Sequence, residues 1–353
     1  MTRTETILVP LGAMLAGLLV FGAFCATLGV NPLLVYASIW KAGFGSWYSW
    51  QNTLVRASPL LLCGLCTAIP ARAGIIVIGN EGAVVVGGLG AIAAGLSTLS
   101  FPPFFSLTLM VLSAMLCGGL WIAFSVALQH YRGVSAVISG LLLNYLAIAL
   151  MNQLVEGPLR DPSSLNNPAS YPLIPDHRLG YFSGTHVHHG LIFGLVACLL
   201  AWFLVERTTF GFAMKIAGGN VRAAQLAGLP VGKLVVIAGF LGGACAGIAG
   251  MVEVAAVHGR ANESLNAGYG YVGILVAFLA RQNPLGVILI SLLVGGLLSS
   301  GGMLQRAHDL PDSTISVLQG ILFLFILFSD TIYGRFQFPW ERTRETKTNA
   351  AAA

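Results

Sequence analysis

The chain alternates long apolar stretches with short polar segments, and this alternation restricts it to proteins that cross a membrane several times. Counting stretches of about 20 apolar residues as helices predicts ten membrane spans. Their approximate ranges are 7–30, 53–71, 74–96, 104–129, 134–155, 189–205, 234–257, 269–280, 285–303 and 313–333. The eighth is too short to cross a bilayer straight. We therefore expect an all-α polytopic membrane protein with about ten transmembrane helices.

The composition excludes an ordinary soluble domain. Of the 353 residues, 56% are hydrophobic and 9% are charged, whereas a soluble domain carries about 25% charged residues. The net charge of +5 does not indicate a nucleic-acid-binding protein, because the Lys and Arg residues lie between apolar stretches and do not cluster on one face. In that arrangement they set the orientation of the chain in the membrane.

The basic residues predict that both termini are cytoplasmic. With the N-terminus inside, the cytoplasmic segments hold Arg3, Arg72, Arg132, Arg207, Lys215, Arg222, Lys233, Arg281, Arg335, Arg342, Arg344 and Lys347. The outer segments hold Lys41, Arg56, Arg160, Arg178, Arg260 and Arg306. This two-to-one excess is in the direction that the positive-inside rule requires. The first apolar stretch is longer than the core of a signal peptide, so we expect it to be retained.

We divide the chain into a transmembrane domain, residues 1–335, and a cytoplasmic tail, residues 336–353. The domain contains the first span (7–30), a first half (53–155), a Pro-rich outer loop (156–188), a basic cytoplasmic segment (206–233) and a second half (234–333). Because the first half begins outside and the second begins inside, we expect inverted-topology repeats with broken helices, a plan common in transporters.

Each half contains a stretch that glycines interrupt. One runs from Gly74 to Gly82 and includes Asn80 and Glu81; the other covers residues 266–273. Broken helices at corresponding positions of two halves are the best sequence indication of a substrate path.

Several polar residues lie inside the apolar stretches. A charged side chain there costs about 2.5–3.5 kcal/mol, so Glu81 should face protein or water. It either lines a path or caps the following helix. Glu253 either lines a path or leans towards the outer interface. The amide and phenol of Asn144 and Tyr145 could bind a ligand or a neighbouring helix.

The residues that we assign to the substrate path are the polar and aromatic residues of these stretches: Asn80, Glu81, Asn144, Tyr145, Glu253, Tyr269, Tyr271 and Phe278. By contrast, Gly239, Gly243 and Gly247 recur every four residues, which is typical of close helix packing.

The segment from Glu206 to Lys233 is a long polar segment that apolar stretches flank on both sides. Within it, we expect a short helix over residues 221–227, ended by Gly228. Alanines occupy its exposed side, where bulky anchors would mark a free-standing amphipathic helix. A surface of such low relief suits a groove in another protein, although an ordinary connecting loop is equally compatible with the composition.

No catalytic or cofactor motif is present. The sequence contains no GxxxxGK[ST] phosphate-binding loop, no HExxH and no GxSxG, so we expect no enzyme activity and no cofactor on this chain. The histidines at 186, 188 and 189 lack further ligands of a metal site, and the six cysteines all fall in apolar segments. We therefore predict no metal site.

Four stretches together resemble a known family. They are Arg72-AGIIVIGNEG, similar to the family pattern RxGxFNIGxEGQ, Gly133-VSAVISGLLLNYLA, Ala217-GGNVRAAQLAG and Gly268-YGYVGILVAFLARQNPLG. In this order they are similar to the permease subunits of ATP-binding-cassette (ABC) importers in the branched-chain amino-acid and simple-sugar permease family, and to the nucleoside-type permeases in particular. The chain departs from the pattern at Val77, Ile78 and Ala83.

The resemblance implies a mechanism and partners. The short cytoplasmic helix would couple to a separate ATPase, which would bind the ATP, through Lys215, Gly218, Asn220, Arg222, Ala223, Ala224 and Gly228. A second permease subunit of a different sequence and an extracytoplasmic binding protein would complete a cell-membrane importer that works by alternating access. A nucleoside is the expected solute, with a simple sugar or a flavin-like molecule as alternatives. An ion-coupled secondary transporter is a further alternative, although intramembrane ionisable groups are scarce.

Overall fold

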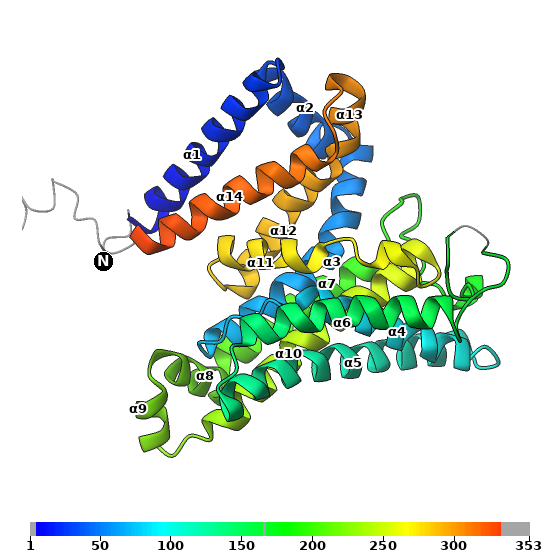
Figure 1. The fold of residues 1–353 in the computed structure, drawn as a ribbon, viewed down its shortest axis with the longest axis vertical. Coiled ribbons are helices and arrows are strands. Elements are labelled where there is room, and N and C mark those ends of the chain that lie inside the picture. The colour runs from blue at the N-terminus through cyan, green and yellow to red at the C-terminus, as the bar shows by residue number, and fades with distance from the viewer. Residues whose placement is uncertain (1–4, 165–166, 333–353) are drawn as a thin grey trace, which may run out of the picture. The chain divides into compact units, whose positions relative to one another are not determined.

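The computed structural model of the chain describes residues 5–164 and 167–332. These residues form helices that are joined by mostly irregular segments (Figure 1). The long helices are α1 (Glu5–Thr27), α2 (Pro32–Phe44), α3 (Trp47–Arg72), α4 (Asn80–Ser97), α5 (Pro103–Arg132), α6 (Ala136–Glu156), α7 (Gly190–Arg207), α10 (Val231–Val252), α12 (Pro284–Ser299) and α14 (Ser313–Ile332). The short ones are α8 (Thr209–Gly219), α9 (Val221–Leu226), α11 (Tyr269–Leu279) and α13 (Gly301–His308). The all-α prediction is confirmed for these residues.

Seven of the described helices are long and apolar enough to cross a membrane, or eight if α1 and α2 form one bent span. The predicted total of about ten spans is therefore supported only in its coarser form. The predicted eighth span corresponds to α11, whose 11 residues extend about 16 Å, roughly half of a bilayer core. The orientation of the termini stays a prediction, and the predicted tail 336–353 lies outside the described residues.

The chain forms two compact units. One comprises Met1–Ser38 and Gly301–Ala353. In its described part α1 packs on α14, and a Cβ atom built on Gly17 would lie 3.1 Å from the Leu322 side chain. The Ser38 hydroxyl and the His308 ring lie 2.9 Å apart and join α2 to α13.

The second unit, Ile39–Ser300, contains the larger core. Its central helix is α10, which packs against α3, α4 and α5, and Figure 1 shows α4, α5, α6 and α10 side by side. Glycines permit this packing: a Cβ atom on Gly118 of α5 would lie 2.6 Å from the Gly243 carbonyl oxygen of α10. The predicted close approach along the α10 glycines is confirmed.

Both predicted breaks are present, and each leads into a helix that starts abruptly. After α3 the chain turns at Gly74, whose φ of 79° belongs to the left-handed region, and remains non-helical until α4 begins at Asn80. The predicted helix over 74–96 therefore starts six residues late. After α10 comes a single π-helical turn, Glu253–His258, and then a largely irregular linker to α11 at Tyr269.

Two of the observed helices, α2 and α8, were not predicted. Residues 31–52 lay between the first two predicted spans, and α2 occupies part of them, with Lys41 in its last turn. In the basic segment, α8 begins after Thr208, whose hydroxyl accepts a hydrogen bond from the Gly211 N–H. The N–H groups of the first helical turn have no carbonyl partner within the helix, and the Thr208 hydroxyl supplies one. This cap favours a helix where the sequence suggested a loop.

Candidate functional site

The starts of α4 and α11 meet at the fully buried carboxylate of Glu81. Its Oε1 accepts a hydrogen bond from the Gly268 N–H at 2.8 Å, and its Oε2 accepts one from the Gly270 N–H at 2.6 Å. These N–H groups belong to the beginning of α11, where backbone donors lack helical partners and the helix dipole is positive. Glu81 therefore caps a helix from the other half of the sequence, although the sequence suggested that it caps the one that follows it.

Two glycines make this approach possible. Gly268 adopts a φ of 80°, a conformation that costs other residues energy. A Cβ atom on Gly270 would overlap the backbone nitrogen of Glu81. We call the contact between the starts of α4 and α11 the half-helix junction.

Asn80 ties the half-helix junction to α3. Its amide nitrogen donates to the Thr67 hydroxyl at 2.7 Å and lies 3.4 Å from the carbonyl oxygens of Cys63 and Gly270. Its amide oxygen accepts a hydrogen bond from the Cys66 thiol at 3.3 Å. Asn80 is fully buried, so its amide satisfies groups that water cannot reach.

Asn144 adds a fourth helix, α6, to the junction. Its amide oxygen accepts a hydrogen bond from the Gly82 N–H at 2.7 Å, and its amide nitrogen donates to the Ile78 carbonyl at 3.1 Å and to the Tyr271 hydroxyl at 3.2 Å. Asn144 thus caps α4 in the manner that Glu81 caps α11. The sequence left open whether this amide binds a ligand or a neighbouring helix. In the structure it forms hydrogen bonds to α4, to α11 and to the segment before α4.

The tyrosines of this region reach the surface of the chain. Tyr271 is 41% exposed and Tyr145 is 69% exposed, while the Asn144 side chain beside them is buried. Tyr271 is hydrogen-bonded to Asn144, the residue before Tyr145 on α6, so α6 and α11 together present phenol groups next to the half-helix junction. Phe278 lies eight residues beyond Gly270, about 12 Å further along α11, and its place in the path stays a prediction.

A second polar cluster lies on the Trp47 side of the junction. Glu253 is buried, and its Oε2 lies 3.5 Å from the His258 Nε2. The Tyr269 hydroxyl accepts a hydrogen bond from the Arg56 guanidinium, and Arg56 also interacts electrostatically with Glu253. Arg56 is not among the predicted path residues and was counted only with the basic residues of the outer segments. Its charge within the predicted span 53–71 was the available signal.

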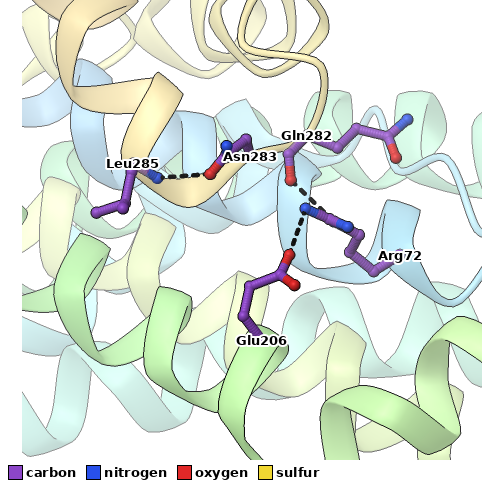
Figure 2. A network of polar contacts seen from close by, with 5 residues as sticks. All are labelled: Arg72, Glu206, Gln282, Asn283 and Leu285. Carbon is purple, nitrogen blue, oxygen red and sulfur yellow. Dashed lines mark hydrogen bonds and ion pairs between the residues drawn. The ribbon is translucent and has the colours of Figure 1, made fainter.

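At the opposite end of α3, Arg72 joins three elements (Figure 2). Its guanidinium forms a 3.0 Å ion pair with Glu206 at the end of α7, and its Nε donates to the Gln282 carbonyl at 3.1 Å. Gln282 and Arg281 both have positive φ, 58° and 50°, so this bond holds a strained turn between α11 and α12. The next residue, Asn283, caps α12 by accepting from the Leu285 N–H.

The basic segment folds as α8 followed by α9. Asn220 caps α9 through a hydrogen bond from the Ala223 N–H at 3.1 Å, and Gly228, with a φ of 77°, ends the turn after it. Lys215, Arg222 and Ala223 are exposed. Ala224 is fully buried, so the two alanines that we assigned to one surface lie on different sides.

The exposed side of α9 is not bare. Leu226 is 90% exposed and Val221 is 49% exposed. The expectation of a low-relief surface was therefore wrong, because the alanines at 223, 224 and 227 do not cover the whole outer face. Gly218, at the end of α8, packs against the turn that follows α3: a Cβ atom on it would lie 2.5 Å from the Arg72 carbonyl oxygen.

Comparison with known families identifies this arrangement. Residues 49–327 match the family described as branched-chain amino acid transport system / permease component. The chain belongs to this permease family. The matched range runs from α3 into α14 and includes the half-helix junction, the Arg72 contacts and the basic segment. The permease is accordingly a transport subunit and a multi-pass membrane protein.

Three relatives match this permease over most of its length. The glucose ABC transporter permease protein TsgB13 of Haloferax volcanii is 29% identical over 91% of this chain and 87% of its own. The guanosine ABC transporter permease protein NupP of Bacillus subtilis is 29% identical over 94% of this chain and 95% of its own. The nucleoside ABC transporter permease protein NupB of Lactococcus lactis is 24% identical over 92% and 91%.

Proposed function

We propose that this permease is the membrane-spanning subunit of an ABC importer for nucleosides. The guanosine and nucleoside permeases that it resembles over more than nine-tenths of its length support this solute. The similarly related glucose permease makes a sugar the second candidate. Both solutes are small and polar, and both offer hydroxyl groups to a path lined by amides and phenols.

The observation that carries the proposal is the half-helix junction beside the exposed tyrosines. Two helices begin inside the unit, and their free N–H groups are satisfied by Glu81 and Asn144. Tyr145 and Tyr271 next to them remain exposed. Irregular backbone at membrane depth is tolerated where it is buried in protein or lines a water-filled cavity, and broken helices are where transporters bind solute. An aromatic ring favours a nucleobase, which can stack on it.

The energy source and partners are part of the proposal. The chain has no phosphate-binding loop, so we assign ATP to a separate ATPase that docks on α8 and α9 through Lys215, Asn220, Arg222, Ala223 and the exposed Leu226. A second permease subunit and an extracytoplasmic binding protein complete the importer in the cell membrane. Nucleotide at the ATPase shifts the population between inward-facing and outward-facing states.

Reconstitution tests this function. The full-length permease, expressed with its neighbouring gene products and purified by a tag, is placed in proteoliposomes with ATP inside or outside. We expect an ATPase to co-purify and tritiated guanosine to be transported only with ATP. Transport of glucose but not guanosine would establish the sugar alternative. Guanosine uptake driven by a proton or sodium gradient without ATP would overturn the ABC mechanism.

A further inference from the structure

The turn between α11 and α12 holds two adjacent residues in an unfavourable backbone conformation. Among the described residues other than glycine, positive φ occurs at Arg281 (50°), Gln282 (58°) and Asp309 (52°). This left-handed region costs energy for a residue that carries a Cβ atom. Such residues persist only where their surroundings hold them, and they are typical of segments that switch between two conformations.

The local sequence explains why the strain falls on Arg281 and Gln282. Their N–H groups donate to carbonyls in the last turn of α11, at 2.9 and 2.8 Å. This pattern usually ends a helix at a glycine, and the chain has none here. Pro284 begins α12 and keeps the preceding Asn283 extended, with a ψ of 118°. The reversal of the chain therefore has to take place at Arg281 and Gln282.

Arg72 holds this turn and connects it to the basic segment (Figure 2). Its Nε donates to the Gln282 carbonyl at 3.1 Å, and its guanidinium forms the 3.0 Å ion pair with Glu206 near the end of α7. Its backbone meets α8, because a Cβ atom on Gly218 would lie 2.5 Å from the Arg72 carbonyl oxygen. One residue thus joins the turn to α7 and to α8.

The helix α11 is held at both ends. At its start, the Gly268 and Gly270 N–H groups donate to the Glu81 carboxylate at 2.8 and 2.6 Å. At its other end, Arg72 holds the carbonyl of Gln282. The 11 residues between these contacts form one continuous helix, about 16 Å long. A displacement of the turn therefore reaches the half-helix junction.

The ion pair between Arg72 and Glu206 is accessible to water. The two side chains keep 21% and 38% of their surface exposed, and ion pairs that water reaches are weak. A movement of α7 and α8 can therefore separate Glu206 from Arg72 without unfolding the surrounding helices.

We propose that Arg72 is a positioning residue for transport. When the basic segment moves, the ion pair with Glu206 opens and Arg72 releases the Gln282 carbonyl. The strained turn then relaxes and shifts α11 at the half-helix junction. This inference rests on the proposed ATP-driven transport and applies equally to a nucleoside and to a sugar.

The substitution Gln282→Gly tests the role of the strain. Glycine adopts a φ near 58° without steric cost, so the turn should become more stable as it stands. We expect a higher unfolding temperature of the purified permease assembly and a severalfold fall in ATP-driven uptake, because relaxation of the turn no longer lowers the energy. Uptake is measured in proteoliposomes with tritiated guanosine, or with tritiated glucose if the assembly carries only sugar. Asp309→Gly relieves the same strain after α13 and is the matched control, with unchanged uptake.

The substitution Glu206→Gln tests the ion pair. It removes the charge that joins Arg72 to α7, so the amount of solute taken up per ATP hydrolysed should fall severalfold. The unfolding temperature should change little, because the pair is partly exposed. Arg207→Gln is the matched control: it alters the next charge on α7, whose guanidinium lies 5.4 Å from the centre of the Trp202 ring, and should leave uptake per ATP unchanged.

Each outcome decides the inference. Unchanged uptake in Gln282→Gly would show that the turn does not relax during transport and would overturn the proposal. A fall in both uptake and unfolding temperature would assign the Gln282 side chain a purely structural role, with the same consequence. If Gln282→Gly does not accumulate, Gln282→Asn replaces it, because Asn tolerates the left-handed region well. It should show the same opposite changes, and their absence overturns the inference, as does equal uptake per ATP in Glu206→Gln and Arg207→Gln.

The proposed function can fail separately. If the parent assembly takes up solute without ATP, the ABC mechanism fails, and the positioning role of Arg72 fails with it. If the parent shows ATP-driven uptake and the Gln282 and Glu206 variants behave like it, only the inference about Arg72 is contradicted.

Discussion

Gly74 and Gly218 lie in contact, so that neither position leaves room for a side chain: a Cβ atom on Gly218 would lie 3.0 Å from the Gly74 nitrogen, and one on Gly74 would lie 3.1 Å from the Gly218 Cα. Gly218 lies in the last turn of α8 in the basic segment, and Gly74 lies at the start of the non-helical stretch that leads to Asn80 and Glu81. Through this contact, a movement of the basic segment would be transmitted directly to the half-helix junction.

Substitution Gly218→Ala should impair coupling. The added methyl group would meet the Arg72 carbonyl oxygen at 2.5 Å and force α8 away from α3, at about 1–3 kcal/mol. We expect ATP-driven uptake to fall severalfold while the ATPase still co-purifies. Gly219→Ala is the control, since nothing lies within 4 Å of its Cβ position. Equal uptake in the two variants would contradict a role for the Gly74–Gly218 contact.

Both Glu81→Gln and Glu81→Ala should destabilise the permease. Glu81 accepts from the buried N–H of Gly270 and the partly buried N–H of Gly268, and a Gln side chain offers an oxygen to only one of them. An unsatisfied buried donor costs about 1–3 kcal/mol, and Ala leaves two. Thermal unfolding followed by a thiol-reactive dye suits this measurement, because Cys63, Cys66 and Cys198 are buried in the fold. The exposed Glu263→Gln is the control, and unfolding temperatures equal to that of the parent in both Glu81 variants would exclude the capping role.

The α9 surface predicts opposite effects for neighbouring positions. Leu226→Ser removes a 90% exposed apolar side chain and should reduce ATPase co-purification while leaving the unfolding temperature unchanged. Ala223→Trp should block docking by filling the interface. Ala224→Trp, at a fully buried site, should instead destabilise the segment. Full ATPase recovery with Leu226→Ser and Ala223→Trp would remove α9 from the interface.

Cysteine labelling tests the orientation. In a background without the native cysteines, Ser163→Cys in the Pro-rich loop and Gln225→Cys in α9 are both exposed. The positive-inside rule predicts that an impermeant thiol reagent labels only Ser163→Cys in intact cells and labels Gln225→Cys after permeabilisation. The reverse pattern would place the basic segment outside and the ATPase assignment would fail.

Stability should depend on His188 at acidic pH. Burial lowers the pKa of His188, in the loop before α7, to about 4, with a smaller contribution from the charge of His189. Because the folded pKa lies below the unfolded value of about 6.5, the stabilisation is complete above pH 6.5 and is lost as pH falls from 6.5 towards 4, by on the order of 3 kcal/mol. His188→Phe should flatten this dependence of the unfolding temperature, whereas the exposed His186→Gln should retain it; equal slopes in all three proteins would show that another group titrates.

Much of this protein follows from local sequence. Apolar length and the scarcity of charge determine a polytopic helical membrane protein, because each segment must satisfy its own backbone hydrogen bonds in lipid. Glycines near 74–82 and 266–273 determine where helices break, and Asn220 and Gly228 determine where α9 begins and ends, because caps and turns depend on a few adjacent residues.

Only the tertiary structure decides which groups meet. Glu81 bonds to residues 187 and 189 positions away, and nothing near it in the chain distinguishes this from capping its own helix. The same holds for Arg56, whose partner Tyr269 belongs to the other half, and for Ala223 and Ala224, which differ only in what packs on each side of α9. Buried polar groups take partners from whichever helices pack around them, and that packing is set by long-range contacts between glycine and apolar surfaces.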